Sequence, residues 1–271
     1  MKLLRAFTTL TLTGAAILLY GALVEVDKLT LERRDLRLRR WPRAKNGFKI
    51  GFVADLHLRD SQTIELTKRA IWTLIEESVD IVVIGGDFVS SWREDSPWIL
   101  GEALEALVGM DCPVIGVPGN RDYYGGDASY LEPILNELGI QLLRNECTSL
   151  LGINWVGIDS ANEHKSDLVS AFGGVQPDQP TIVLWHEPDV VDQLPPGDAV
   201  LMLSGHSHGG QFTTPWGWAP VTTVNGRIYM RGYYPDAPTP LYVSRGLGTT
   251  GPPSRLFCRP EVTVLTLFSD D

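Results

Sequence analysis

Two histidines, one residue apart, follow an apolar segment in the last third of the chain. His206 and His208 stand directly after the run 199–204, which consists of small and apolar residues, and glycines flank the pair. Histidines at positions i and i+2 that leave the end of a strand can each point a ring nitrogen into one small volume, and imidazole is a common metal ligand. This spacing therefore indicates a metal site at the end of a buried strand.

Four of the five histidines, two aspartates and one asparagine occupy the same kind of position, at or just past the end of an apolar run. These residues are Asp55, His57, Asp87, Asn120, His186, His206 and His208. Each of them alone could instead cap a helix, occupy a turn or form a hydrogen bond in the core. Together they predict one polynuclear metal site assembled from five segments. The fifth histidine, His164, lies between two charged residues and is expected to be a solvated loop residue.

Length and charge restrict the class of protein. A chain of 271 residues with 44% hydrophobic content is long enough for one large α/β domain. The net charge is −10, but the first 45 residues carry ten lysines and arginines against four acids, which leaves −16 on the rest. A domain this acidic lacks the basic excess that nucleic acid binding requires and suits divalent cations better.

The three cysteines are an odd number and have no C-x-x-C spacing. This pattern indicates neither a disulfide framework nor a zinc knuckle, so buried free thiols in a reducing compartment are expected.

The N-terminus contains an uncharged run of 19 residues, 6–24, behind Lys2 and Arg5. This length is sufficient for a helix that crosses a hydrocarbon core of about 30 Å. A cleaved signal peptide is the alternative, although its apolar core is usually only about 7 to 15 residues long. We therefore predict a membrane anchor over residues 1–28, followed by a basic juxtamembrane strand or linker over 29–45.

The basic flank after the apolar run places the body of the protein in the cytoplasm by the positive-inside rule. Leucines that alternate with charged residues from position 29 also predict a half-exposed strand there. Its arginines form a solvated face or touch anionic lipid headgroups.

Apolar runs alternate with segments of helical spacing from residue 48 onward. Strands are predicted over 48–54, 81–84, 114–117, 153–158, 181–185, 199–204, 241–244 and 261–267, and helices over 64–75, 97–108 and 129–138. This alternation predicts buried strands in an α/β fold, with the site residues at their carboxyl ends.

Five ordered motifs resemble those of the calcineurin-like metallophosphoesterases. They are Asp55-x-His57, Gly86-Asp87, Gly119-Asn120-Arg121-Asp122, His186 and Gly205-His206-x-His208. The similarity extends from about residue 48 to the C-terminus, and the Ser-Arg-Gly-Leu-Gly of 244–248 and the Arg-Pro-Glu of 259–261 resemble the membrane-associated branch of that family.

The resemblance implies a four-layer α/β/β/α sandwich over residues 46–271 that holds two divalent metal ions. It assigns Asp55, His57, Asp87 and His208 to one ion and Asp87, Asn120, His186 and His206 to the other, with Asp87 as the bridge, and it gives Asn120, Arg121, Asp122 and His186 catalytic roles. Nitrogen and oxygen ligands without thiolate favour Mn, Fe, Zn or Mg. Two such ions can activate water at neutral pH and hold both oxygens of an in-line displacement at phosphorus.

Arg121 departs from the common family pattern, in which a histidine helps to protonate the leaving oxygen. A guanidinium stays charged and cannot donate this proton, but it can bind phosphate oxygens in a bidentate manner. A phosphate that leaves a pyrophosphate has a second pKa of about 6 and needs no acid, so Arg121 favours a diphosphate substrate.

The Gly-Asn-Arg-Asp motif also resembles the UDP-2,3-diacylglucosamine hydrolases of lipid A synthesis, whose lipid-linked nucleotide suits a membrane anchor. Two alternatives remain open: a general phosphodiesterase or phosphatase that acts on another phosphorylated small molecule, and a non-catalytic scaffold with the same fold. The aromatic segment after His208, which contains Trp216 and Trp218, is either core or a lipid groove.

Overall fold

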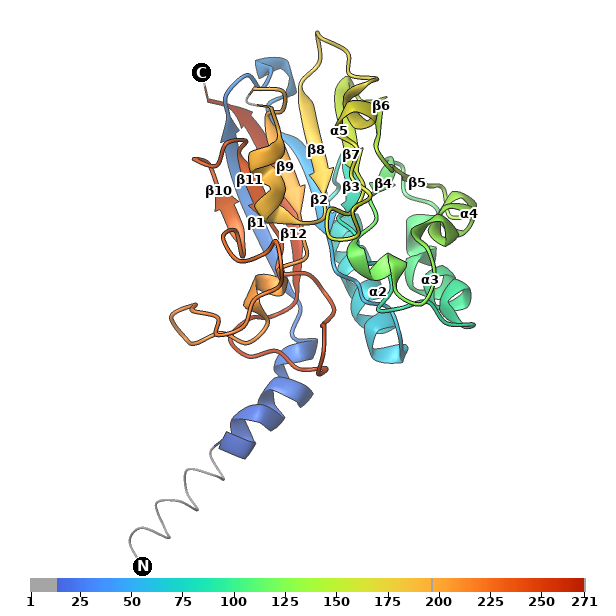
Figure 1. The fold of residues 1–271 in the computed structure, drawn as a ribbon, viewed down its shortest axis with the longest axis vertical. Coiled ribbons are helices and arrows are strands. Elements are labelled where there is room, and N and C mark those ends of the chain that lie inside the picture. Colours follow the sequence, from blue (N-terminus) through green and yellow to red (C-terminus); the bar gives the residue numbers. More distant parts are fainter. Residues whose placement is uncertain (1–13, 196, 271) are drawn as a thin grey trace, which may run out of the picture.

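The computed structural model describes residues 14–195 and 197–270 and contains two six-stranded mixed sheets (Figure 1). The first sheet has the order β1 (Thr30–Leu38), β12 (Glu261–Ser269), β2 (Phe48–Val53), β3 (Ile81–Ile84), β4 (Val114–Gly116), β5 (Ile140–Leu142). The second has the order β10 (Gly232–Tyr234), β11 (Leu241–Val243), β9 (Leu201–Ser204), β8 (Thr181–Trp185), β7 (Ile153–Ile158), β6 (Glu146–Leu150).

Three apolar cores separate four layers. Helices α2 (Ser61–Glu76), α3 (Ser96–Leu104) and α4 (Leu131–Glu137) pack on the first sheet. Side chains of both sheets, among them Phe52 and Trp155, form the central core. The short helix α5 (Leu168–Phe172) and the 3-10 helix Pro188–Gln193 cover the second sheet. The α/β fold predicted from the sequence is confirmed, and its layers follow the predicted α/β/β/α order.

The parallel pairing of the central strands brings the site residues to one edge. In the first sheet β2, β3 and β4 are parallel neighbours, with Val53 opposite Ile84 and Ile84 opposite Gly116. In the second sheet β8 and β9 are parallel neighbours, with Leu184 opposite Leu203. Because the carboxyl ends of parallel neighbours meet at one edge, every predicted ligand leaves its sheet at the same end of the molecule.

Several short elements differ from the sequence-based prediction. The strands β5, β6 and β10 were not predicted, since two are only three residues long and β6 is a half-exposed edge strand of mostly polar residues. The helix predicted over 97–108 ends at Leu104 and continues as a 3-10 turn. All three cysteines are free thiols, although only Cys258 is buried.

The segment 29–45 is not a linker outside the catalytic fold. Strand β1 pairs in parallel with β12 over nine residues, from Thr30 opposite Glu261 to Leu38 opposite Ser269. The alternation of charged residues and leucines therefore forms an edge strand of the first sheet, with Leu36 and Leu38 in the central core. Strand β1 thus lies in the same sheet as strands from residues 46–271.

Residues 14–23 form a helix that projects from the lower end of the body (Figure 1). The predicted span 6–24 begins in residues 1–13, which lie outside the described part of the chain. Within residues 14–195 and 197–270, no helix combines the length and the apolar character needed to cross a bilayer.

Arg255 connects loop segments near the site residues. Among the described residues, no carboxylate forms an ion pair with its guanidinium. It is fully buried, and its guanidinium donates hydrogen bonds to the carbonyl oxygens of Arg245, Gly246 and Gly248 at 2.9, 3.0 and 2.5 Å. Burial lowers the pKa of Arg255 from its ordinary value. These bonds fix two parts of the connection between β11 and β12 against each other, residues 245–248 and the part around Arg255.

We expect Arg255→Met to lower the free energy of unfolding by about 3 kcal/mol or more, because it leaves several buried carbonyls without a donor. Urea unfolding measures this change, and the exposed Arg259→Met provides the matched control. Equal urea midpoints for the two variants would contradict the stabilising role of the Arg255 hydrogen bonds.

Candidate metal centre

The turns that follow the strands have an unusual backbone conformation. Five of the predicted ligands have positive φ angles: Asp55 (52°), His57 (47°), Asp87 (54°), His206 (68°) and His208 (52°). Non-glycine residues rarely adopt this left-handed conformation, and such strain concentrates at functional sites. This backbone conformation turns the side chains at the strand ends toward a common centre.

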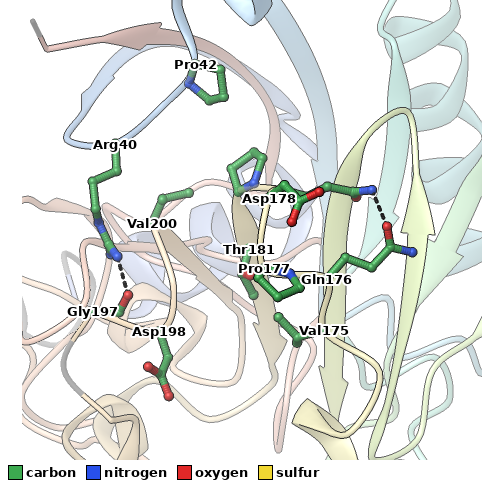
Figure 2. A pocket seen from close by; sticks show the side chains of 12 residues that line it. Arg40, Pro42, Val175, Gln176, Pro177, Asp178, Thr181, Gly197, Asp198 and Val200 are labelled. Atoms are coloured by element: carbon green, nitrogen blue, oxygen red, sulfur yellow. Dashed lines mark hydrogen bonds between the residues drawn. The ribbon is translucent and has the colours of Figure 1, made fainter.

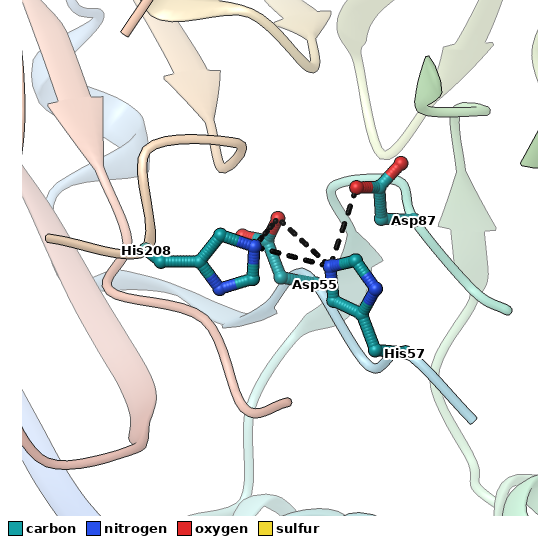
Figure 3. A group of neighbouring side chains, drawn as sticks. All are labelled: Asp55, His57, Asp87 and His208. Atoms are coloured by element: carbon teal, nitrogen blue, oxygen red, sulfur yellow. Dashed lines mark hydrogen bonds and ion pairs between the residues drawn. The ribbon is translucent and has the colours of Figure 1, made fainter. Parts of the chain in front are cut away.

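One group of four potential ligands, Asp55, His57, Asp87 and His208, is contributed by both sheets (Figure 3). The Nε2 atoms of His57 and His208 are 3.1 Å apart. His57 Nε2 lies 3.4 Å from Asp87 Oδ2, and His208 Nε2 lies 3.5 Å from Asp55 Oδ1. Bonds of about 2.0 to 2.2 Å to one cation place neighbouring ligand atoms about 3 to 3.5 Å apart, so this group has the spacing of a coordination sphere.

A second group shares Asp87 with the first and adds His186 and His206. His186 Nε2 lies 3.3 Å from Asp87 Oδ2. The opposite ring nitrogen, Nδ1, donates a hydrogen bond of 2.6 Å to the Gly85 carbonyl, and His206 Nε2 donates one of 2.6 Å to the Val224 carbonyl. Hydrogen bonds of this kind fix the tautomer and leave the other ring nitrogen available to a metal.

Three buried polar atoms of the predicted ligands have no hydrogen-bond partner among the described residues. They are Asn120 Oδ1, His186 Nε2 and His208 Nδ1, and the first two belong to the same predicted ligand set. A buried polar atom without a partner is costly, and a divalent cation would satisfy both a carbonyl oxygen and a neutral imidazole nitrogen. The residues therefore fit a dimetal centre, and its metal could be Mn, Fe, Zn or Mg.

Asp122, which the sequence predicted to be catalytic, holds the loop that carries Asn120. Its two oxygens accept backbone hydrogen bonds from Val89 at 3.1 Å and Gly119 at 2.8 Å, and its side chain is buried. A Cβ on Gly119 would collide with the Asp87 carboxylate and come within 2.8 Å of His186 Nε2. Asp122 therefore holds this turn in place, and position 119 of the turn has room only for glycine.

The protonation of the cluster depends on burial and on mutual charge. Burial raises the pKa of Asp55 to about 7, against the opposing effect of His186. Burial also lowers the pKa of His57 to about 3 and that of His208 well below its ordinary value. For His186, burial favours the neutral form, but Asp87 outweighs it and raises the pKa well above the ordinary value. Without metal, the cluster therefore retains protons on Asp55 and His186 near neutral pH.

We expect metal affinity to increase as the pH rises through 7, because a cation must displace the protons on Asp55 and His186. Calorimetry with Mn²⁺ at about pH 6 and pH 8, in buffers of different ionisation enthalpy, measures both affinity and proton release. Asp55→Asn should bind more weakly and release fewer protons. Equal affinity at both pH values without proton release would contradict this description of the cluster.

Several residues near the centre were not identified from the sequence. Asn162 Nδ2 lies 3.2 Å from His206 Nε2, and Arg59 donates hydrogen bonds of 3.0 and 3.1 Å to Thr249. Gln211 holds the loop 250–254, since its amide nitrogen donates to three carbonyls of that loop and its oxygen accepts from the Thr250 amide. Of these residues, only Gln211 could have been found from the sequence, because it lies just after the His-Ser-His stretch. His164 is exposed, as predicted.

Two cavities lie at opposite ends of the second sheet. One of about 380 Å³, lined by Arg40, Thr181 and Val200, lies at the amino ends of β8 and β9 and is remote from the cluster (Figure 2). The other, of about 290 Å³, is bordered by His208 and has Phe212, Val221 and Pro252 in its walls. The second cavity is therefore the one that a substrate bound at the centre could use.

The fold and the buried aspartate and histidine cluster define a metal-dependent phosphoester hydrolase. The model of the calcineurin-like phosphoesterase family matches residues 48–210, and this chain belongs to that family.

Three bacterial and vertebrate relatives support this membership. The chain is 31% identical to the uncharacterized metallophosphoesterase YkuE of Bacillus subtilis, over 84% of this chain and 82% of the relative. It is 32% identical to the phosphodiesterase YaeI of Escherichia coli, over 81% and 82%. A Bos taurus transmembrane protein with metallophosphoesterase domain is 31% identical, over 86% of this chain and 56% of the relative.

The fold is shared with a solved structure, a dimetal phosphatase from Danio rerio. Its TM-score is 0.52 at 14% identity, and the alignment covers 82% of this chain and 93% of the other.

Proposed function

We propose that this hydrolase cleaves the pyrophosphate bond of a lipid-linked nucleotide such as UDP-2,3-diacylglucosamine, in lipid A synthesis. The observation that carries the proposal is the position of Arg121. Its backbone amide donates a 2.7 Å hydrogen bond to Asp87 Oδ1, so it adjoins the carboxylate shared by both ligand groups. Its guanidinium is half-exposed, donates to Thr250 Oγ1 at 2.7 Å and lies 4.5 Å from the ring centroid of Tyr124.

These contacts support a catalytic role for Arg121 that acts through charge. Two divalent ions in the cluster would supply Lewis acidity and an activated water nucleophile. Asp87 would contribute to both ligand sets, and Asn120 and His186 would help to hold one of the ions. Arg121 would bind oxygens of the phosphate that leaves and stabilise its negative charge. The departing phosphate carries this charge without a proton, so no acid is required.

The cavity beside His208 supports the lipid part of the proposal. Its apolar walls and hydroxyl-bearing residues, which include Thr222 and Thr223, could accept the first part of an acyl chain and the polar group next to it. This cavity adjoins both the metal cluster and Thr250, the partner of Arg121.

A phosphodiesterase that acts on another substrate is the second candidate, and the name of the Escherichia coli relative favours it. Purified protein with Mn²⁺ should be assayed against a UDP-linked lipid, a nucleotide diphosphate and an aryl phosphodiester. The proposal expects the highest kcat/KM on the first. A preference for the aryl phosphodiester would support the second candidate. A protein that binds no metal and turns over none of the three would be a scaffold.

We further propose that the N-terminus anchors the protein in a membrane, with the catalytic domain on the cytoplasmic side. The bovine relative is called a transmembrane protein, and the apolar run 6–24 is long enough to span. A deletion of residues 1–20 would spare Gly21 and Glu25, which accept hydrogen bonds from the backbone amides of Arg255 and Cys258.

We expect this deletion to move the protein from the membrane fraction to the soluble fraction while activity on a water-soluble substrate persists. Fractionation, with mass spectrometry of the mature N-terminus, measures the outcome. A full-length protein that is already soluble would contradict the anchor, and a mature N-terminus near Val24 would show that the segment is a cleaved signal.

A further inference from the structure

Six large apolar side chains are exposed on two loops next to the metal centre, and we call this set the apolar surface. Their exposed fractions are 81% for Trp216, 60% for Trp218, 76% for Val221, 61% for Val224, 65% for Ile228 and 49% for Phe257. Exposed apolar residues are common singly, but a cluster of this size marks an interaction site. Neither Trp216 nor Trp218 belongs to the core, whereas Tyr229 and Tyr234 of the same aromatic segment pack against it.

Backbone contacts join the loops that carry the apolar surface. Phe212 forms an isolated bridge with Leu256, and Thr213 Oγ1 donates to the Phe257 carbonyl at 3.0 Å. Val224 is next to the centre because its carbonyl accepts the hydrogen bond of His206. The apolar surface is therefore part of the same end of the molecule as the ligands.

The N-terminal helix leaves the body at this end as well. The Arg255 amide donates to the Gly21 carbonyl at 3.2 Å, and the Cys258 amide donates to Glu25 Oε1 at 2.9 Å. Figure 1 shows the blue helical segment below the orange and red loops. Leu18 and Leu23 of this helix are 63% and 73% exposed, and the uncharged sequence continues toward Ala6 outside the described residues.

The segment 205–260, which carries the apolar surface, has a charge opposite to that of the whole chain. Residues 205–260 contain five arginines and one acidic residue, Asp236, whereas the chain has a net charge of −10. Arg227 and Arg259 of this segment are exposed. Exposed tryptophan together with arginine is the combination found where proteins meet the headgroup region of an anionic bilayer.

We propose that the apolar surface docks on a phospholipid bilayer, with Trp216 and Trp218 in the headgroup region. The cavity beside His208 then opens toward the lipid, because Val221 belongs both to the cavity wall and to the apolar surface. A lipid substrate would reach the centre without leaving the bilayer for water. The docking goes beyond the hydrolysis proposed above and does not depend on it.

The test uses the full-length protein reconstituted into vesicles of phosphatidylethanolamine and phosphatidylglycerol with brominated acyl chains, which quench tryptophan at the membrane. Wild type is compared with Trp216→Phe/Trp218→Phe. Trp72→Phe/Trp98→Phe is the matched control, since Trp72 and Trp98 are 57% and 65% exposed on the helices of the first sheet. We expect the first pair to lower the quenched signal by about twofold or more and the control pair to leave it unchanged.

Equal quenching in wild type and in the Trp216→Phe/Trp218→Phe variant would overturn the docking. Dimerisation through the apolar surface would overturn it as well. In that case wild type would be a dimer in detergent, and the Trp216→Glu/Trp218→Glu variant would be a monomer. A protein that fails to hydrolyse the UDP-linked lipid but still shows the expected quenching would sink only the proposed substrate.

Discussion

Asp87→Ala is expected to abolish turnover and the binding of the metal pair while the protein stays folded. The Asp87 carboxylate belongs to both ligand groups and lies 3.4 Å from His57 and 3.3 Å from His186. Without it, two cations would stand close together with less compensating charge, so their repulsion would expel at least one of them. We expect activity to fall to background, because a two-metal mechanism requires both ions.

Three measurements make this prediction specific. Elemental analysis gives metal per chain, circular dichroism reports the fold, and steady-state kinetics report activity. Asp87→Asn separates the loss of charge from the loss of volume, and the exposed Asp178→Ala serves as the control. A variant at position 87 that retains two metals and near wild-type activity would be incompatible with a bridging carboxylate.

Arg121→Ala is expected to cost about 2.7 to 4 kcal/mol of transition-state stabilisation on a pyrophosphate substrate, the typical loss of one donor at an oxyanion. This corresponds to a fall of about 10² to 10³ in kcat/KM. The reason is that the guanidinium is held beside the cluster by Thr250 and Tyr124, where it can meet the leaving phosphate.

Arg121→His should change the preferred leaving group. Imidazole cannot reproduce the bidentate fork, so pyrophosphate hydrolysis should fall, while an alkyl phosphodiester whose alcohol needs a proton should be hydrolysed relatively better. The measured quantity is the ratio of kcat/KM for the two substrates in wild type and both variants, with the exposed Arg93→Ala as control. If wild type already prefers the alkyl phosphodiester, the pyrophosphatase proposal fails.

The sequence alone determined the class of protein and most of the ligand set. Continuous apolar runs predict buried parallel strands, and the carboxyl ends of such strands share one edge of a sheet. Polar residues after these runs, such as Asp55, Asp87 and His206, were therefore expected to meet before their contacts were known. Short polar edge strands such as β6 escaped prediction because their residues alternate too little to reveal a buried face.

Only the tertiary structure decided how these residues meet and what surrounds them. The left-handed turns at Asp55, Asp87 and His208 depend on packing from neighbouring strands, since non-glycine residues seldom hold that conformation unless the surrounding structure imposes it. The hydrogen bonds of Gln211 likewise join segments about forty residues apart. Residue spacing over such a separation does not predict which side chains will be in contact. The apolar surface also depends on the tertiary structure. Trp216 and Phe257 are exposed because the fold places both of their loops beside the N-terminal helix and no other described element covers them.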